Sequence, residues 1–175
     1  MNLMDLKETF RFVAPRVRDA AIKAAAQLER LGVRFALGGG LAVGAHGYVR
    51  ATTDVDFLVG EEAFEHHGPL VNFKAGIPIE VDGIKIDYLS PISLGPQLEE
   101  VLNHAPMSEG LPVVPVDALI YMKLVARRRK DLVDVVELIK AGADIQRVRD
   151  YVVKYADDLI PLFEELVDEA LAEWD

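Results

Sequence analysis

Two aspartates one residue apart, Asp54 and Asp56, stand at the start of an apolar run. The alternation of polar and apolar residues predicts a β-strand over residues 53–59, because successive side chains of a strand point to opposite faces. Both carboxylates therefore face the same side, while Val55 and Phe57 face a core. Neighbouring carboxylates repel each other unless a cation lies between them, and Mg²⁺ is the usual cation. A pair of this kind also occurs on the polar side of an ordinary half-exposed strand.

A diglycine upstream of the aspartates favours a metal-binding pair over the polar side of an ordinary strand. Gly39 and Gly40 follow a short predicted strand over residues 33–37 and open a predicted helix over residues 41–46, which Gly47 ends. Glycines at the start of a helix leave backbone N–H groups open to phosphate oxygens. A phosphate-binding turn next to metal-binding carboxylates is typical of nucleotide chemistry.

A third carboxylate comes from a later strand. Residues 84–89 alternate in period two, so Asp87 lies on the face opposite Ile84 and Ile86. If this strand lies beside residues 53–59, the three aspartates converge. Two of them can then bridge a pair of Mg²⁺ ions, and the third can bind one ion and orient or deprotonate an attacking hydroxyl.

The remaining elements predict an α/β (α+β) fold, with a mixed β-sheet flanked by helices and a C-terminal helical bundle. We expect a nucleotide-binding core over residues 1–115 and a helical region over residues 116–175, with the seam near residues 105–116. Before the seam, the pattern predicts a helix over 5–30 that Pro15 kinks or splits, helical turns over 61–67, and strands over 71–73 and 77–81 that lead to an Asp82-Gly83 turn. It then predicts a helix over 94–103 and an extended segment over 111–116. The later helices are predicted over 117–128, 130–141, 144–155 and 158–173.

Composition limits the compartment and the partners. The chain has no cysteine, which excludes thiolate metal sites and fits a cytoplasmic protein. We expect no signal peptide and no contact with membranes, because no apolar run is long enough for either. The formal charge of −10 disfavours broad binding to nucleic acid. It leaves room for a local basic patch that binds one nucleoside triphosphate (NTP) or one tRNA end.

The motif G-G-x-A followed by H-G-x-x-R-x-T-x-D-h-D, over residues 39–56, together with the acidic strand residue Asp87, resembles the DNA polymerase β-type nucleotidyltransferase superfamily. The segment K-L-x-A-x-R-x-K-D-h-x-D, over residues 123–134, extends the likeness. Within the superfamily, the chain is most similar to the small abortive-infection (AbiEii-like) toxin nucleotidyltransferases. The resemblance covers residues 33–140 and leaves out the last helices.

The resemblance implies a transferase that moves a nucleoside monophosphate from an NTP to a hydroxyl of a tRNA, a protein or a small molecule. It also implies a possible toxin with a cognate antitoxin. Asp54, Asp56 and Asp87 would be catalytic and would hold Mg²⁺ or Mn²⁺. The residues implied to contact the NTP are Gly39, Gly40, Arg50 and Thr53 on one side, and Lys123, Lys130 and Asp131 on the far wall.

Other polar residues have simpler interpretations. The spacing of Lys123, Arg127, Lys130, Asp131 and Asp134 predicts one shared helical face. For Arg127, Arg129 and Asp134 we expect a solvated, salt-bridged surface. We expect His66 and His67 on a surface, His104 in a loop, Trp174 in packing or in an exposed tail, and His46 packing near the glycine turn with at most a minor phosphate contact.

Two other functions are compatible with the sequence. The chain could be an inactive nucleotide-binding or partner-interaction module, although all three acidic positions are present. It could also be an acidic helical scaffold that engages a basic partner through residues 157–173.

Overall fold

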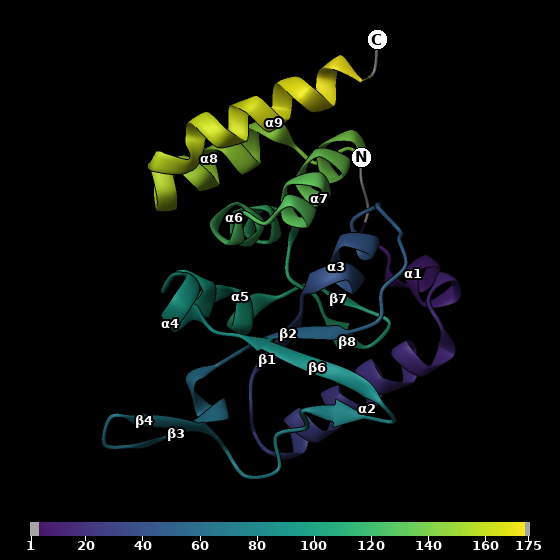
Figure 1. Ribbon diagram of the computed structural model, residues 1–175, viewed down its shortest axis with the longest axis vertical. Coiled ribbons are helices and arrows are strands. Elements are labelled where there is room, and N and C mark those ends of the chain that lie inside the picture. The colour runs from purple at the N-terminus through teal and green to yellow at the C-terminus, as the bar shows by residue number, and fades with distance from the viewer. Residues whose placement is uncertain (1–3, 174–175) are drawn as a thin grey trace.

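The computed structural model describes residues 4–173 (Figure 1). Trp174, for which we expected packing or an exposed tail, lies outside this range. The chain begins with α1 (Leu6–Phe12) and α2 (Pro15–Arg30). Pro15 occupies the first turn of α2, where its missing N–H costs no helical hydrogen bond. The predicted split of the N-terminal helix at Pro15 is therefore confirmed.

A four-stranded mixed sheet forms the centre of the first part of the chain. Its order is β1 (Phe35–Leu37), β2 (Val55–Val59), β6 (Ile84–Leu89) and β5 (Glu80–Val81). Strands β2 and β6 are parallel, and the two outer pairings are antiparallel. The predicted mixed sheet is thus confirmed, with β1 and β2 starting two residues later than expected. The Asp82-Gly83 turn joins β5 to β6 with positive φ at both residues.

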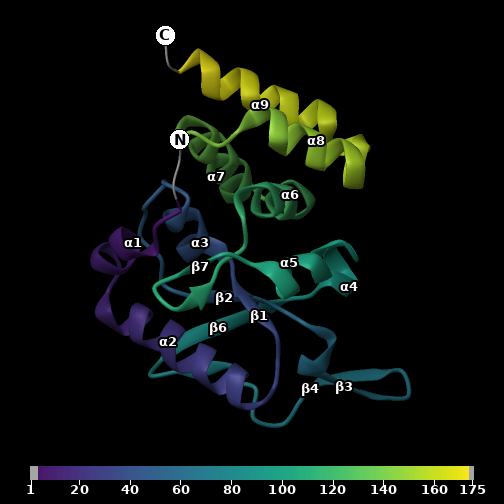
Figure 2. The same cartoon turned by 180° about the vertical axis from the view of Figure 1, so that it is seen from behind.

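The prediction of helical turns over residues 61–67 is wrong for most of that segment. Only Glu61–Ala63 forms a 3₁₀ turn (η1), and β3 (Phe64–His67) then pairs with β4 (Leu70–Phe73). The cross-strand pair Phe64 and Phe73 stacks with ring centroids 5.4 Å apart, which stabilises a strand over a helix here. The hairpin projects from the body of the molecule (Figures 1 and 2).

Helices cover both faces of the sheet. Helix α2 packs across β2, β5 and β6 on one face (Figure 2). On the other face α3 (Gly39–Ala45) packs on β2, and α5 (Leu98–His104) lies against β1. The helix predicted over 94–103 is present as α5 but begins later, at Leu98, because Gly95 has φ 141° and Pro96 follows it; the separate helix α4 (Pro91–Leu94) precedes it. The short strands β7 (Met107–Ser108) and β8 (Leu111–Pro112) complete this part.

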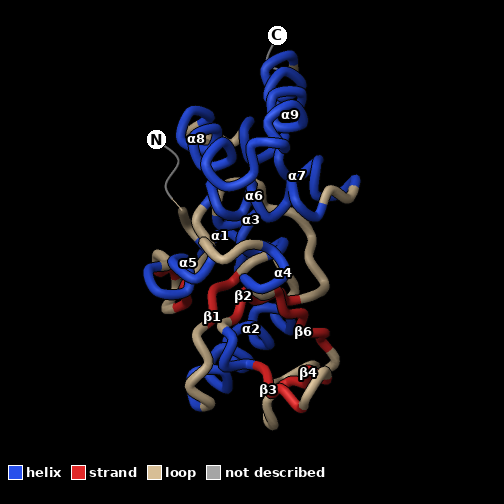
Figure 3. Tube along the Cα trace, turned by 90° about the vertical axis from the view of Figure 1, so that its left-hand side faces the viewer, coloured by secondary structure: helices blue, strands red, loops and turns tan. Residues whose placement is uncertain are grey.

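The rest of the chain is helical, as predicted. It consists of α6 (Val116–Ala126), α7 (Arg129–Lys140), α8 (Ile145–Ala156), the 3₁₀ turn η2 (Asp157–Leu159) and α9 (Ile160–Ala172). Helices α6 and α7 lie between the sheet and the outer helices α8 and α9 (Figure 3). The buried apolar side chains form one cluster from Leu6 in α1 to Ala170 in α9. The boundary near residue 115 stays a prediction.

No helix within residues 4–173 is both long enough and apolar enough to cross a bilayer.

Candidate functional site

Asp56 and Asp87 lie directly opposite each other on the parallel strands β2 and β6. The same pairing sets Val55 against Ile86 and Phe57 against Tyr88. Because side chains alternate along a strand, the two aspartates lie on one face of the sheet and these other residues lie on the opposite face. Asp54 precedes β2 at a bend and is exposed, and only Val55 separates it from Asp56 in the chain. The predicted adjacency of the two strands is therefore present.

The diglycine makes room for the acidic strand. Gly39 has φ +55°, and a Cβ there would lie 2.6 Å from the Cγ of Asp56 and overlap its carboxylate. A Cβ on Gly40 would overlap the Thr52 hydroxyl and lie 3.1 Å from the Nη1 of Arg50. A side chain at either position would therefore force the neighbouring side chains to move. The phosphate-binding role of the two glycines stays a prediction.

Arg50 connects the sheet half to the helical half. Its Nε donates to Asp134 Oδ1 at 2.9 Å, and its Nη2 donates to Oδ2 at 3.0 Å. Lys123 Nζ donates to the same Oδ2 at 2.8 Å and to Asp131 Oδ1 at 3.2 Å. The side chains of Asp131 and Asp134 are 1% exposed, so these are buried, charge-assisted hydrogen bonds.

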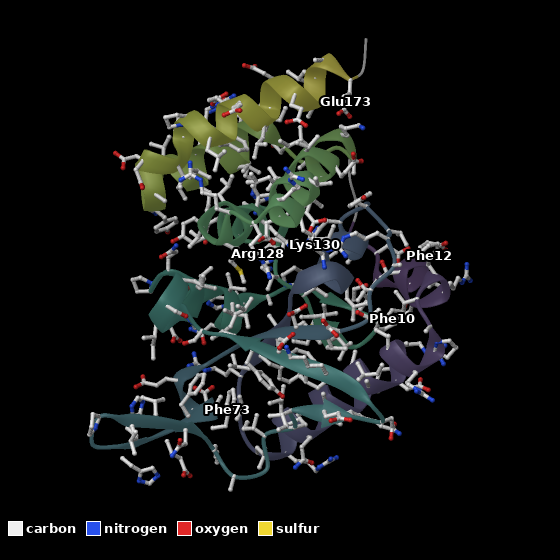
Figure 4. All side chains as sticks on the ribbon, viewed as in Figure 1. Phe10, Phe12, Phe73, Arg128, Lys130 and Glu173 are labelled. Atoms are coloured by element: carbon white, nitrogen blue, oxygen red, sulfur yellow. The ribbon has the colours of Figure 1, made fainter. Side chains whose placement is uncertain are left out.

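Asp131 also organises the start of α7. Its Oδ2 accepts from the backbone N–H of Arg128 at 3.2 Å and from Arg128 Nε at 2.8 Å. The guanidinium of Arg128 is mostly exposed, and Arg128 and Lys130 extend toward the sheet half of the molecule (Figure 4). The hydrogen bond that Arg128 donates to Asp131 raises the pKa of the Arg128 guanidinium above its ordinary value.

The structure corrects two expectations about this charged segment. Residues 123–134 do not share one helical face, because Arg127 is left-handed (φ 59°) and ends α6 before α7 begins. Asp134 is not on a solvated surface but is fully buried between Arg50 and Lys123. The turn at Arg127, rather than helical spacing, brings Lys123 beside Asp131 and Asp134.

A pocket of about 410 Å³ lies between the sheet and the α6–α7 turn. That volume is within the usual range for small-ligand sites. Its apolar lining comes from β6, α4 and α6. The predicted site residues that line it are Gly39, Gly40, Arg50, Asp54, Asp56, Asp87, Lys123, Lys130 and Asp131.

Thr53 is the predicted site residue that does not line the pocket. It is exposed, whereas its neighbour Thr52 is half-buried and its neighbour Asp54 lines the pocket. Thr52 lies against Gly40, and Arg50 Nη1 donates to its hydroxyl at 3.5 Å. The sequence signal for Thr52 was available, because Thr52 is the threonine of the H-G-x-x-R-x-T-x-D motif.

The carboxylate of Asp56 lies in a partly buried environment next to two other acidic side chains. Burial raises the pKa of Asp56, and the neighbouring Asp87 and Asp54 raise it further, while Lys123 and Lys130 act in the opposite direction. Asp87 is paired with Lys85 at 3.2 Å. Within residues 4–173, no three histidine or acidic side chains are grouped closely enough to hold one ion as they stand. The chemistry of the aspartates fits a hard divalent cation, and their role as ligands stays a prediction.

The histidines lie away from the acidic pair. His46 is buried at the end of α3, and its Nε2 is 2.7 Å from the carbonyl oxygen of Val114. The expected packing role of His46 is therefore present. His66 and His67 are exposed, as predicted, although on β3, and His104 ends α5 rather than lying in a loop.

No protein-family model matches the chain, and no curated protein matches it in sequence. Among solved structures, the chain is similar to an antigenic nucleotidyltransferase-like protein from Paracoccidioides brasiliensis. The sequence identity is 14% and the TM-score is 0.45, and the similarity covers 86% of this chain and 93% of that chain.

Proposed function

We propose that the protein is a metal-dependent nucleotidyltransferase that transfers a nucleoside monophosphate from an NTP to a hydroxyl. The observation that carries this proposal is the register of β2 and β6, which sets Asp56 against Asp87 in a pocket that Asp54 also lines. Carboxylates and cationic side chains face each other across that pocket, from the sheet on one side and the α6–α7 turn on the other. The combination suits a substrate that carries both phosphates and a bound cation.

In this proposal each aspartate has a role. Asp54 and Asp56 would hold Mg²⁺ or Mn²⁺, and Asp87 would complete the site and accept the proton of the attacking hydroxyl. The hydroxyl oxygen forms a bond to the α-phosphorus, the bond from that phosphorus to the bridging oxygen breaks, and pyrophosphate leaves. A bound divalent cation supplies charge neutralisation on the phosphate oxygens.

The cations of the pocket differ in their freedom to bind phosphate. Lys123 is buried and already donates to Asp131 and Asp134, and Arg50 is held by Asp134. Lys130 is exposed, lines the pocket and takes part in none of the ion pairs found within residues 4–173. Lys130 is therefore the primary phosphate contact of the proposal, with Arg128 beside it. Gly39 and Gly40 would bound the phosphates on the opposite side.

The test is transfer of α-labelled NTP in the presence of Mg²⁺ to three kinds of acceptor: total tRNA, protein and small polyhydroxylated compounds such as aminoglycosides. We expect labelled product with at least one acceptor. Asp56→Asn and Asp87→Asn should each reduce the transfer rate by about a hundredfold or more, as the loss of charge-stabilising groups does. Asp82→Asn is the matched control, because Asp82 lies in the exposed turn before β6 and pairs with Lys23.

Undiminished transfer by Asp56→Asn or Asp87→Asn would contradict the mechanism. NTP binding by calorimetry without turnover on any acceptor would favour the alternative, an inactive nucleotide-binding or partner-interaction module. A role as the toxin of a toxin–antitoxin pair belongs to the same proposal. It predicts that expression of the wild-type chain arrests growth, that Asp56→Asn does not, and that a co-expressed neighbouring gene relieves the arrest.

A further inference from the structure

The lining of the pocket that binds the NTP in the proposed function changes from apolar to charged along its length. Helix α6 presents Leu119, Met122, Lys123 and Ala126 to it, at spacings of three and four that share one face. Lys123 and the α6–α7 turn form a charged end, and Leu119 and Met122 precede Lys123 on the helix. Between Leu119 and Lys123 the helical wall passes from apolar to cationic over about 6 Å, at 1.5 Å per residue, and Ala126 follows at the end of the helix.

The strand wall changes in the same direction. Lys85, Asp87 and Leu89 alternate onto the pocket face of β6, and Leu89 is the last residue of the strand. Leu94 of α4 lies beyond it and also lines the pocket. The pocket therefore has an apolar end, formed by Leu89, Leu94, Leu119 and Met122, and a charged end that contains the aspartates and the cations.

The polar side chains beside the apolar end either have hydrogen-bond partners within the protein or do not line the pocket. Tyr88 lines the pocket, but its ring turns to the opposite face of the sheet, 6.3 Å from that of Phe57, and its hydroxyl donates to the carbonyl of Pro78. The Tyr121 hydroxyl donates to the carbonyl of Leu94 at 2.6 Å. Neither Tyr121 nor Gln97 is among the residues that line the pocket.

We infer that the apolar end holds the nucleobase by contact alone and that the protein discriminates weakly among the four NTPs. This inference rests on the proposed function, because the phosphates at the charged end direct the base to the other end. An apolar wall separates similar ligands by about 10- to 200-fold at most, whereas a wall built to hydrogen-bond its ligand rejects others by about 10⁴-fold or more. Met122 adds tolerance, because its unbranched side chain adapts to different shapes.

The test is calorimetric titration of the full chain with the α,β-methylene analogues of ATP, GTP, CTP and UTP in Mg²⁺, with inorganic tripolyphosphate as a fifth probe. We expect the four dissociation constants to lie within about tenfold of each other and tripolyphosphate to bind at least about tenfold more weakly. Met122→Ala should weaken all four analogues by about three- to tenfold and leave tripolyphosphate unchanged. Met107→Ala is the matched control, because Met107 is exposed on β7 and lies outside this pocket.

Each contrary outcome identifies what has failed. A preference for one base of more than about two-hundredfold would overturn the inference and leave the proposed function standing. Tripolyphosphate binding as tightly as the analogues would also overturn it, because the base would then contribute nothing. If none of the five probes binds, the proposed function itself fails. Should Met122→Ala not fold, Leu94→Ala truncates a half-buried side chain of the same wall and replaces it.

Discussion

The guanidinium of Arg50 and the carboxylate of Asp134 form two parallel hydrogen bonds, although 84 positions separate them in the chain. Arg50 precedes the strand that carries Asp56, and Asp134 lies in α7. The pair therefore joins the sheet to the helical half at the wall of the pocket. Because Lys123 donates to the same carboxylate, Asp134 sets the position of two cations at once.

Asp134→Ala should destabilise the protein strongly. Removal of one partner from a buried ion pair costs about 3–5 kcal/mol, because the remaining charges stay desolvated and unpaired. Here Arg50 and Lys123 would both lose hydrogen bonds to a carboxylate that is 1% exposed. Urea unfolding followed by circular dichroism measures the loss. Asp150→Ala, at an exposed position of α8, should stay within about 0.5 kcal/mol of the wild type. Equal effects of the two substitutions would show that the pair contributes little.

Gly39→Ala should cost more than Gly32→Ala, although both glycines have positive φ. At Gly32 (φ +72°) a Cβ would have no atom within 4 Å, so the cost is the backbone strain alone, about 1 kcal/mol. At Gly39 (φ +55°) the Cβ would also overlap the Asp56 carboxylate and force it to move. Thermal unfolding of the two variants measures the difference. Equal melting temperatures would mean that the carboxylate moves aside at no cost.

Lys130→Ala should weaken NTP binding and leave stability unchanged. Lys130 is exposed and lines the pocket, and a charged hydrogen bond is worth about 1.5–3 kcal/mol, or roughly ten- to a hundredfold in affinity. Titration calorimetry with a nonhydrolysable NTP analogue measures the change. Lys154→Ala, on the exposed side of α8, is the control. Wild-type affinity in Lys130→Ala would remove this lysine from the proposed phosphate site.

The local part of the site could be predicted from the sequence, and the long-range part could not. Period two along β2 and β6 places Asp56 and Asp87 on defined faces, and each alternation is visible within a few residues. The burial of Asp134 depends on Arg50, which arrives from a distant segment, and on the left-handed turn at Arg127. The spacing of residues 123–134 predicts neither the contact with Arg50 nor the turn at Arg127.

The hairpin β3–β4 shows the same limit in another form. Residues 64–67 alternate little in polarity, and their structure depends on the stack of Phe64 on Phe73 across the turn. Phe73 in turn lies 5.4 Å from the ring of Tyr88 on β6. A segment of weak intrinsic preference is thus fixed by contacts outside it, which a helical interpretation of residues 61–67 could not include.

Stability should fall as the pH drops from about 7 to 5, and His46 should account for much of the fall. Burial lowers the pKa of His46, so the unfolded chain, with a histidine pKa of about 6.5, binds the proton more tightly. The stabilisation is complete above the unfolded pKa and is lost as the pH falls through it toward the folded value, by at most about 1.4 kcal/mol per pH unit. Urea unfolding at intervals from pH 8 to 5 measures this slope. His46→Gln should flatten it, whereas His66→Gln, at an exposed position of β3, should not. If stability still falls with pH as steeply in His46→Gln, the pH dependence comes from other titrating groups. The substitution removes the proton-binding site of His46 and no other.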